Sequence, residues 1–174
     1  MGWCRAWLVA MLPACSFEVQ LVAADARAVS ACTFSVTIGG SSSTYLLSSD
    51  LLSWRLAEAS CESLGAHLFV PDTDAEADAM RGKLTGDKRW VGIAQPFGQA
   101  SPTAGWVRIT GGDVTTRWAN GKPDEAGGPE TGGEQAGSLA AGGFDDDDHH
   151  VARPYICECD GIAVVRTTVE MLPP

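Results

Sequence analysis

The stretch that decides the fold is Ser53–Gly65, with the sequence SWRLAEASCESLG. Its first residue is a typical N-cap and its last a typical helix terminator, so a helix is predicted from Trp54 to Leu64. Apolar residues recur within it at spacings of 0, 3, 7 and 10, starting at Trp54 and including Cys61. These spacings define one helical face, so Cys61 is predicted to point into the core.

Around this helix, short runs rich in β-branched and aromatic residues predict strands over 33–38, 44–47, 67–70, 89–93, 106–109 and 153–159. Thr73 and Glu76 form a capping box for a second helix that is predicted to end near Leu84. From Gly111 to Gly143 the chain is rich in Gly, Asp, Glu and Ala, which predicts a long irregular loop. This order of elements predicts an α+β domain.

The N-terminal residues 1–31 have the layout of a secretory signal peptide, with cleavage expected somewhere in 26–31. Arg5 precedes an apolar stretch that ends in small residues; an N-terminal core helix is the alternative, which Pro13 disfavours. The domain is expected over 32–160, followed by a short tail over 161–174. No transmembrane segment is expected after the signal, because no apolar run reaches 18 residues. The predicted location is secreted, extracellular or cell surface.

The composition argues against two classes of function. The chain has 174 residues, with 12 Lys and Arg against 22 Asp and Glu, a formal net charge of −10. An acidic surface repels phosphate backbones, so no nucleic-acid partner is expected. No nucleophile paired with a base, phosphate-binding glycine loop or zinc-protease helix is recognisable, so the chain is not expected to be an enzyme.

Four cysteines remain after the predicted signal: Cys32, Cys61, Cys157 and Cys159. In an oxidising compartment an even set indicates two disulfides, with three possible connectivities. A zinc site is the alternative, but the single residue between Cys157 and Cys159 is fewer than zinc sites usually have.

Five segments resemble the C-type lectin-like domain family, and the resemblance runs from about Cys32 to Asp160. The resembling segments are SWRLAEASC (53–61), GAHL (65–68), WVGI (90–93), Trp118 through Asp124, and YICE (155–158). Each segment alone is weak evidence, but all five occur in the family's order and spacing. The resemblance implies the C-type lectin-like fold, with two helices, small antiparallel sheets and a long irregular loop.

The resemblance also implies how the cysteines pair. The family joins the first-helix cysteine to the final-strand cysteine, which here gives Cys61–Cys157. Its first and last strands lie side by side, which makes Cys32–Cys159 a natural second bridge; an intermolecular or free thiol is the alternative. The family's inner disulfide is absent, because its positions hold Ala136 and His149, so a looser long loop is expected.

In sugar-binding members of the family, the long loop holds a calcium ion, and two hydroxyls of the sugar complete the coordination shell of that ion. The matching oxygen donors here are Asp124, Glu134, Asp145 and Asp146, and an Asp after the proline resembles the version associated with galactose. The remaining position holds Lys122, which cannot ligate a metal because an ammonium has no acceptor. Either Lys122 swings out and calcium binds, or its charge replaces the ion. The candidate ligand-binding residues are these four acids and Lys122.

Two hypotheses of function follow from the resemblance. The first is a secreted or cell-surface module that recognises a glycan through calcium, and the second is the same fold recognising a protein ligand without calcium. The run from Asp145 to His150 has further interpretations: a zinc or other transition-metal site, a pH response, or a solvated acidic loop. His67 is expected to be a surface residue.

Overall fold

The computed structural model describes residues 32, 34–124 and 133–173. The described chain contains three helices, which are α1 (Trp54–Ser63), α2 (Asp74–Arg81) and α3 (Arg166–Glu170). Its strands are β1 (Thr44–Leu52), β2 (His67–Leu68), β3 (Arg89–Ala94), β4 (Val107–Arg108), β5 (Ala136–Ala140), β6 (Gly143–Asp147) and β7 (Arg153–Cys159). The predicted signal peptide lies outside the described residues.

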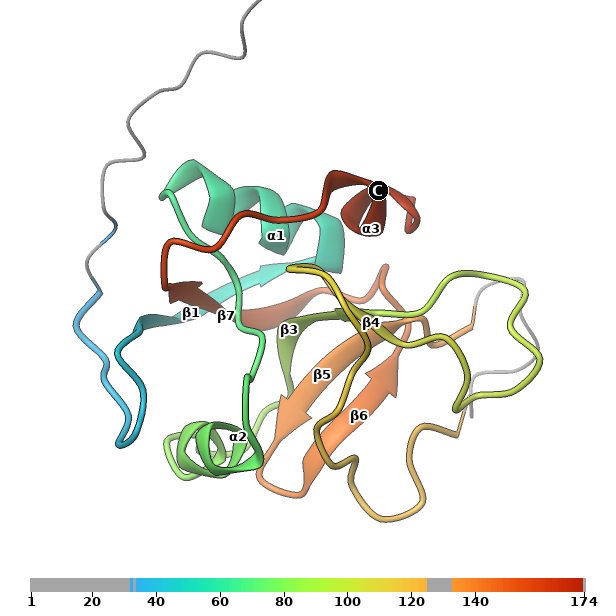
Figure 1. Cartoon of the computed structure of the whole chain (residues 1–174), viewed down its shortest axis with the longest axis horizontal. Helices are drawn as coiled ribbons and strands as arrows, with labels where there is room; N and C mark the ends of the chain where they lie inside the picture. Colours follow the sequence, from blue (N-terminus) through green and yellow to red (C-terminus); the bar gives the residue numbers. More distant parts are fainter. Residues whose placement is uncertain (1–31, 33, 125–132, 174) are drawn as a thin grey trace, which may run out of the picture.

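The strands form one sheet in the order β1-β7-β3-β5-β6, and β2 and β4 pair with β7 and β3. The first strand runs antiparallel to the last, with Thr44 opposite Cys159, whereas β3 meets β7 in parallel at Trp90 and Tyr155. Figure 1 shows α1 and α2 on opposite sides of the region where β7 and β3 meet. The chain is therefore α+β, as the sequence predicts.

Two apolar clusters form the core, one packed on α1 and one on α2. Trp54 and Trp90 are fully buried, and their indole nitrogens donate hydrogen bonds of 2.8 Å to the carbonyls of Val91 and Leu52. These bonds satisfy the polar atom of each indole, so both rings can be buried without leaving an unpaired donor. Glycine is needed at position 92 of β3, because a Cβ there would lie 2.6 Å from the Leu68 carbonyl oxygen.

Two disulfides join the N-terminal part of the domain to its last strand, β7. Cys61 on α1 is bonded to Cys157 on β7, with both residues fully buried, and this confirms that Cys61 points inward. Cys32 is bonded to Cys159, with 5.8 Å between the Cα atoms. Both pairings are the ones that the resemblance implies.

Several expected strand boundaries are wrong. In the described part of 33–38 the backbone forms only an isolated bridge, Val36 to Tyr45, because it meets the edge strand β1 at one point. The expected strand over 44–47 continues to Leu52. The long loop expected from Gly111 to Gly143 ends early, because β5 pairs with β3 and carries β6 as a hairpin.

The helices and the C-terminal segment also differ from expectation. The first helix ends at Ser63, one residue early, and α2 ends at Arg81 because the next residue is Gly82. The segment after 160, expected as a tail, contains α3 and packs on α1: Leu172 is fully buried and its carbonyl accepts a 2.9 Å hydrogen bond from Arg55. None of the helices in the described ranges is long and apolar enough to cross a membrane.

Candidate ligand-binding site

The segment that leads to Asp124 is held against β6 by aromatic packing. Trp118 contacts Trp106 with ring centroids 4.7 Å apart, and it also lies edge-on to Phe144 of β6. The backbone N–H of Ala119 donates to the Phe144 carbonyl at 2.8 Å. These contacts fix the start of the segment, which continues through a cis Lys122–Pro123 peptide.

Three of the predicted ligands converge at this edge of the sheet. Asp124, Glu134 and Asp146 come from separate segments, and each places a carboxylate oxygen within 4.8 Å of the others. Asp146 is fully buried, Glu134 is half-buried and Asp124 is exposed. The backbone N–H of Asp124 donates to Oδ2 of Asp146 at 3.0 Å, which ties the loop to the strand.

Lys122 lies among the acids that it was predicted to accompany. Its Nζ is 2.8 Å from Oδ1 of Asp124, 2.9 Å from Oδ1 of Asp145 and 3.9 Å from Oδ1 of Asp146. Burial opposes the charge of Lys122, but the hydrogen bonds that it donates to Asp124 and Asp145 outweigh this effect and raise the pKa of the ammonium. Lys122 is therefore charged at every physiological pH.

A second lysine, Lys88, which the sequence does not predict at this site, lies among the same acids. It precedes β3, and its Nζ lies 2.6 Å from Oδ2 of Asp145 and 3.2 Å from Oδ1 of Asp147. Each carboxylate oxygen of Asp145 is thus paired with a different lysine. Burial alone would raise the pKa of this carboxyl, but the two ion pairs outweigh burial and lower it. No local motif in the sequence marks Lys88, because its role depends on the pairing of β3 with β5 and of β5 with β6.

The next acid, Asp147, is held by hydrogen bonds to side chains of two other strands. Its Oδ1 accepts from Arg153 at 2.6 Å, and its Oδ2 accepts a hydrogen bond from the Ser138 hydroxyl at 2.5 Å. The site thus combines five carboxylates with three cations, leaving two net negative charges. These groups are Asp124, Glu134, Asp145, Asp146 and Asp147, with Lys88, Lys122 and Arg153.

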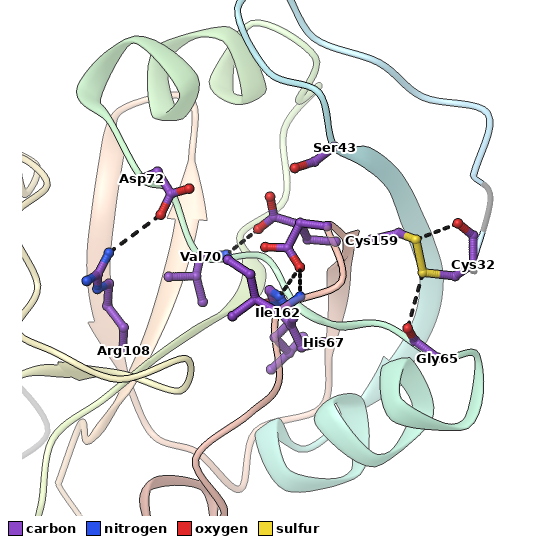
Figure 2. A network of polar contacts seen from close by, with 12 residues as sticks. Cys32, Ser43, Gly65, His67, Val70, Asp72, Arg108, Cys159 and Ile162 are labelled. Atoms are coloured by element: carbon purple, nitrogen blue, oxygen red, sulfur yellow. Dashed lines mark hydrogen bonds and ion pairs between the residues drawn. A yellow bond between two sulfur atoms is a disulfide. The ribbon is translucent and has the colours of Figure 1, made fainter. Parts of the chain in front are cut away.

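His67 lies in a different polar cluster, and the expectation that it is a surface residue is wrong. It is 2% exposed, and its ring nitrogens pair with the Leu68 carbonyl at 2.7 Å and with Asp160 at 3.0 Å. Figure 2 shows this network, in which Asp160 also accepts from the backbone N–H of Ile162. Burial is possible because Asp160, far along the chain, supplies the partner.

Two buried glutamates flank this network. Glu58 accepts a 2.8 Å hydrogen bond from the Leu68 N–H, and Glu158 accepts one of 3.0 Å from the Val70 N–H. Burial raises the pKa of each to about 7. For His67, burial lowers the pKa, but the bonds to Asp160 and the Leu68 carbonyl and the charges of Asp160 and Glu158 together outweigh it, so its pKa rises to about 9. The two glutamates thus satisfy the backbone N–H groups of β2 and of the segment that follows it.

Comparison with known proteins gives one family and a consistent fold. Residues 50–159 match the family described as the lectin C-type domain. The scavenger receptor C-type lectin carbohydrate-recognition domain of mouse has 24% identity and a TM-score of 0.60, over 68% of this chain and 90% of that one. The murine dendritic cell inhibitory receptor 2 domain, solved in complex with N-glycan, has 22% identity and a TM-score of 0.55, over 67% and 89%. These structures establish a C-type lectin fold.

Sequence relatives are larger proteins. C-type mannose receptor 2 of Mus musculus is 31% identical over 110 residues, which is 62% of this chain and 7% of that protein. Hepatic lectin of Gallus gallus is 26% identical over 86 residues, or 48% of this chain and 40% of that protein. The chain therefore spans less than half the length of either relative.

Proposed function

Because this chain belongs to the lectin C-type domain family, we propose that it recognises carbohydrate through a calcium ion held by Asp124, Glu134 and Asp146. The observation that carries the proposal is the convergence of these three carboxylates within 4.8 Å. Members of the family bind carbohydrate and are not enzymes, and one structural neighbour was solved with a bound N-glycan. The proposed setting is extracellular or cell surface.

The chemistry of the donors suits calcium. A hard divalent cation takes six to eight oxygen ligands, and three carboxylates from separate segments supply the charged part of such a shell. The two net negative charges left in the site equal the charge that a calcium ion would neutralise. When bound, the ion would offer coordination positions to the hydroxyls of a sugar.

We propose a different role for one of the four predicted calcium ligands, Asp145. Both oxygens of Asp145 are paired, with Lys88 at 2.6 Å and Lys122 at 2.9 Å. We therefore assign Asp145 to holding the two lysines in place, and we take as metal ligands the three acids whose carboxylates converge. Lys122 then borders the ion and can donate a hydrogen bond to a ligand oxygen.

A second candidate function is favoured by the position of Lys122 itself. Its ammonium contacts Asp124 and Asp145 as a resident cation, the arrangement expected if calcium is replaced. In that case the same face would recognise a protein ligand without a metal.

Calcium titration calorimetry separates the two. Lys122→Glu replaces a cation by an oxygen donor, so it should tighten calcium binding by about tenfold or more. Lys83→Glu, at an exposed lysine after α2, makes the same change in net charge away from the site and should leave the affinity as it is. The absence of calcium heat in both the wild-type chain and Lys122→Glu would eliminate the first proposal.

A glycan array, run once in calcium and once in chelator, tests the sugar directly. Calcium-dependent signal that is lost in Asp146→Asn supports recognition at this face. Signal that persists in chelator would separate sugar binding from the metal, and an empty array would favour the protein ligand.

A further inference from the structure

The connection between β6 and β7 carries a second cluster of metal-binding side chains that the proposed function does not use. Asp148, His149 and His150 each present a ligand atom, and these atoms lie within 4.8 Å of one another. Imidazole nitrogens distinguish this cluster from the all-oxygen set at Asp124, and they suit transition metals rather than calcium.

His149 is the unusual member of the cluster. It is 1% exposed, yet within the described part of the chain neither ring nitrogen has a hydrogen-bond partner. The Oδ1 atom of Asp148 is 4.0 Å from its Nδ1, beyond hydrogen-bond reach. Buried polar groups are almost always paired, so an imidazole with two unpaired nitrogens needs an explanation.

The surroundings hold His149 in place. Its carbonyl accepts a 2.9 Å hydrogen bond from the backbone N–H of Trp54, the first residue of α1. The Phe97 ring lies edge-on to the imidazole, with centroids 5.8 Å apart. The backbone and the ring of His149 are therefore positioned by these contacts, neither of which uses a ring nitrogen.

The spacing of the three side chains approaches that of a tetrahedral metal site. Nδ1 of His150 is 3.0 Å from Oδ1 of Asp148, and the two imidazoles lie 3.9 Å apart at their centroids. Ligands bound to zinc at about 2.0–2.1 Å sit about 3.3 Å from each other in a tetrahedron. The separations of 3.0 and 4.0 Å to Asp148 bracket this value, so small side-chain rotations suffice.

The cluster is also accessible. The side chains of Asp148 and His150 are 43% and 53% exposed, so an ion can enter from solvent and a water can complete the shell. We propose that Asp148, His149 and His150 bind a divalent transition metal, with zinc as the expected ion. This site is additional to the proposed calcium site and does not depend on it.

Zinc titration calorimetry of the purified full chain tests the proposal. The oxidised protein is alkylated to block free thiols and kept in excess calcium, so that neither cysteine thiols nor the Asp124 cluster contribute. We expect one zinc ion per chain, with affinity at least about tenfold weaker in His150→Ala and Asp148→Asn. Both positions are half-exposed, so these variants should fold; Asp50→Asn, at an exposed acid of β1, is the matched control and should bind as wild type.

Cobalt substitution provides a second readout, because the ligand-field bands of a tetrahedral site should appear in wild type and disappear in His150→Ala. The proposal is overturned if the wild-type chain takes up no zinc, if both variants bind as wild type, or if Asp50→Asn loses binding equally. No glycan is present in either measurement, so failure here leaves the carbohydrate proposal as it stands.

Discussion

Removing one disulfide at a time should reveal that the two crosslinks are nested. The Cys61–Cys157 bond spans 96 residues, which corresponds to about 4.7 kcal/mol of unfolded-state entropy at room temperature. The Cys32–Cys159 bond spans 127 residues and would contribute about 4.9 kcal/mol if it were alone. The two values do not add, because one loop contains the other.

The stability that the second disulfide adds depends on a smaller loop. With Cys61–Cys157 formed, Cys32–Cys159 closes only the 29 positions from Cys32 to Cys61 and the two from Cys157 to Cys159. That ring of about 31 residues corresponds to about 3.7 kcal/mol, so both bonds together contribute about 8 kcal/mol. By the same reasoning, removing either bond alone should cost about 3.5–4 kcal/mol.

The two single-bond variants should nevertheless differ. Cys61 and Cys157 are fully buried in the core, whereas Cys32 is half-buried, so replacing the first pair by alanine also loses packing. We expect the Cys61→Ala, Cys157→Ala protein to be less stable than the Cys32→Ala, Cys159→Ala protein. The protein lacking all four thiols should fail to fold, because the loss approaches the whole stability of a typical domain.

Urea unfolding, with thiol counts to verify the remaining bond, measures these differences. The reasoning is refuted if the Cys32→Ala, Cys159→Ala protein unfolds with the wild-type free energy. It is also refuted if the protein lacking all four cysteines still folds, since the combined loss should approach the whole stability of the domain.

Two further predictions concern stability. Glu58 and His67 have folded pKa values of about 7 and about 9 against ordinary values of 4.5 and 6.5, so the folded chain binds more protons and the free energy of unfolding should fall as pH rises from about 4.5 to about 9. In urea titrations across this pH range, the decrease in unfolding free energy should be smaller by up to about 3 kcal/mol in Glu58→Gln than in the wild-type chain. A wild-type unfolding free energy that rises with pH would contradict the raised pKa values. Gly137→Ala should destabilise the chain by about 1–3 kcal/mol, because its Cβ would lie 1.9 Å from Cγ1 of Ile93. Gly142→Ala meets nothing within 4 Å and should unfold as wild type in the same assay; equal effects at the two glycines would contradict the packing argument.

The sequence predicts best the elements whose signals are local. The face containing Trp54 and Cys61 follows from helical spacing, and β7 was predicted with its observed limits because its residues favour strands. The sequences of β5 and β6, AGSLA and GFDDD, are poor strand formers, and they pair because β3 offers a partner. Tertiary pairing of this kind overrides local propensity.

The candidate site was predictable only in part, for a related reason. The positions of Asp124, Glu134 and Asp146 follow from the family motif, and the structure brings all three together. Lys88 and the burial of His67 depend on partners distant in sequence, Asp145 and Asp160. Ion pairing across a sheet leaves no spacing pattern for the sequence to reveal.

The bond between Cys32 and Cys159 has a mechanical consequence. It joins the chain to β7, whereas the proposed ligand face lies on β6 at the far edge of the sheet. A force applied to the domain at Cys32 while a ligand holds β6 would pass through the disulfide into β7 and then across β3 and β5. The disulfide thus bypasses the hydrogen bonds of β1, so the edge strand is protected from being peeled off the sheet by such a force.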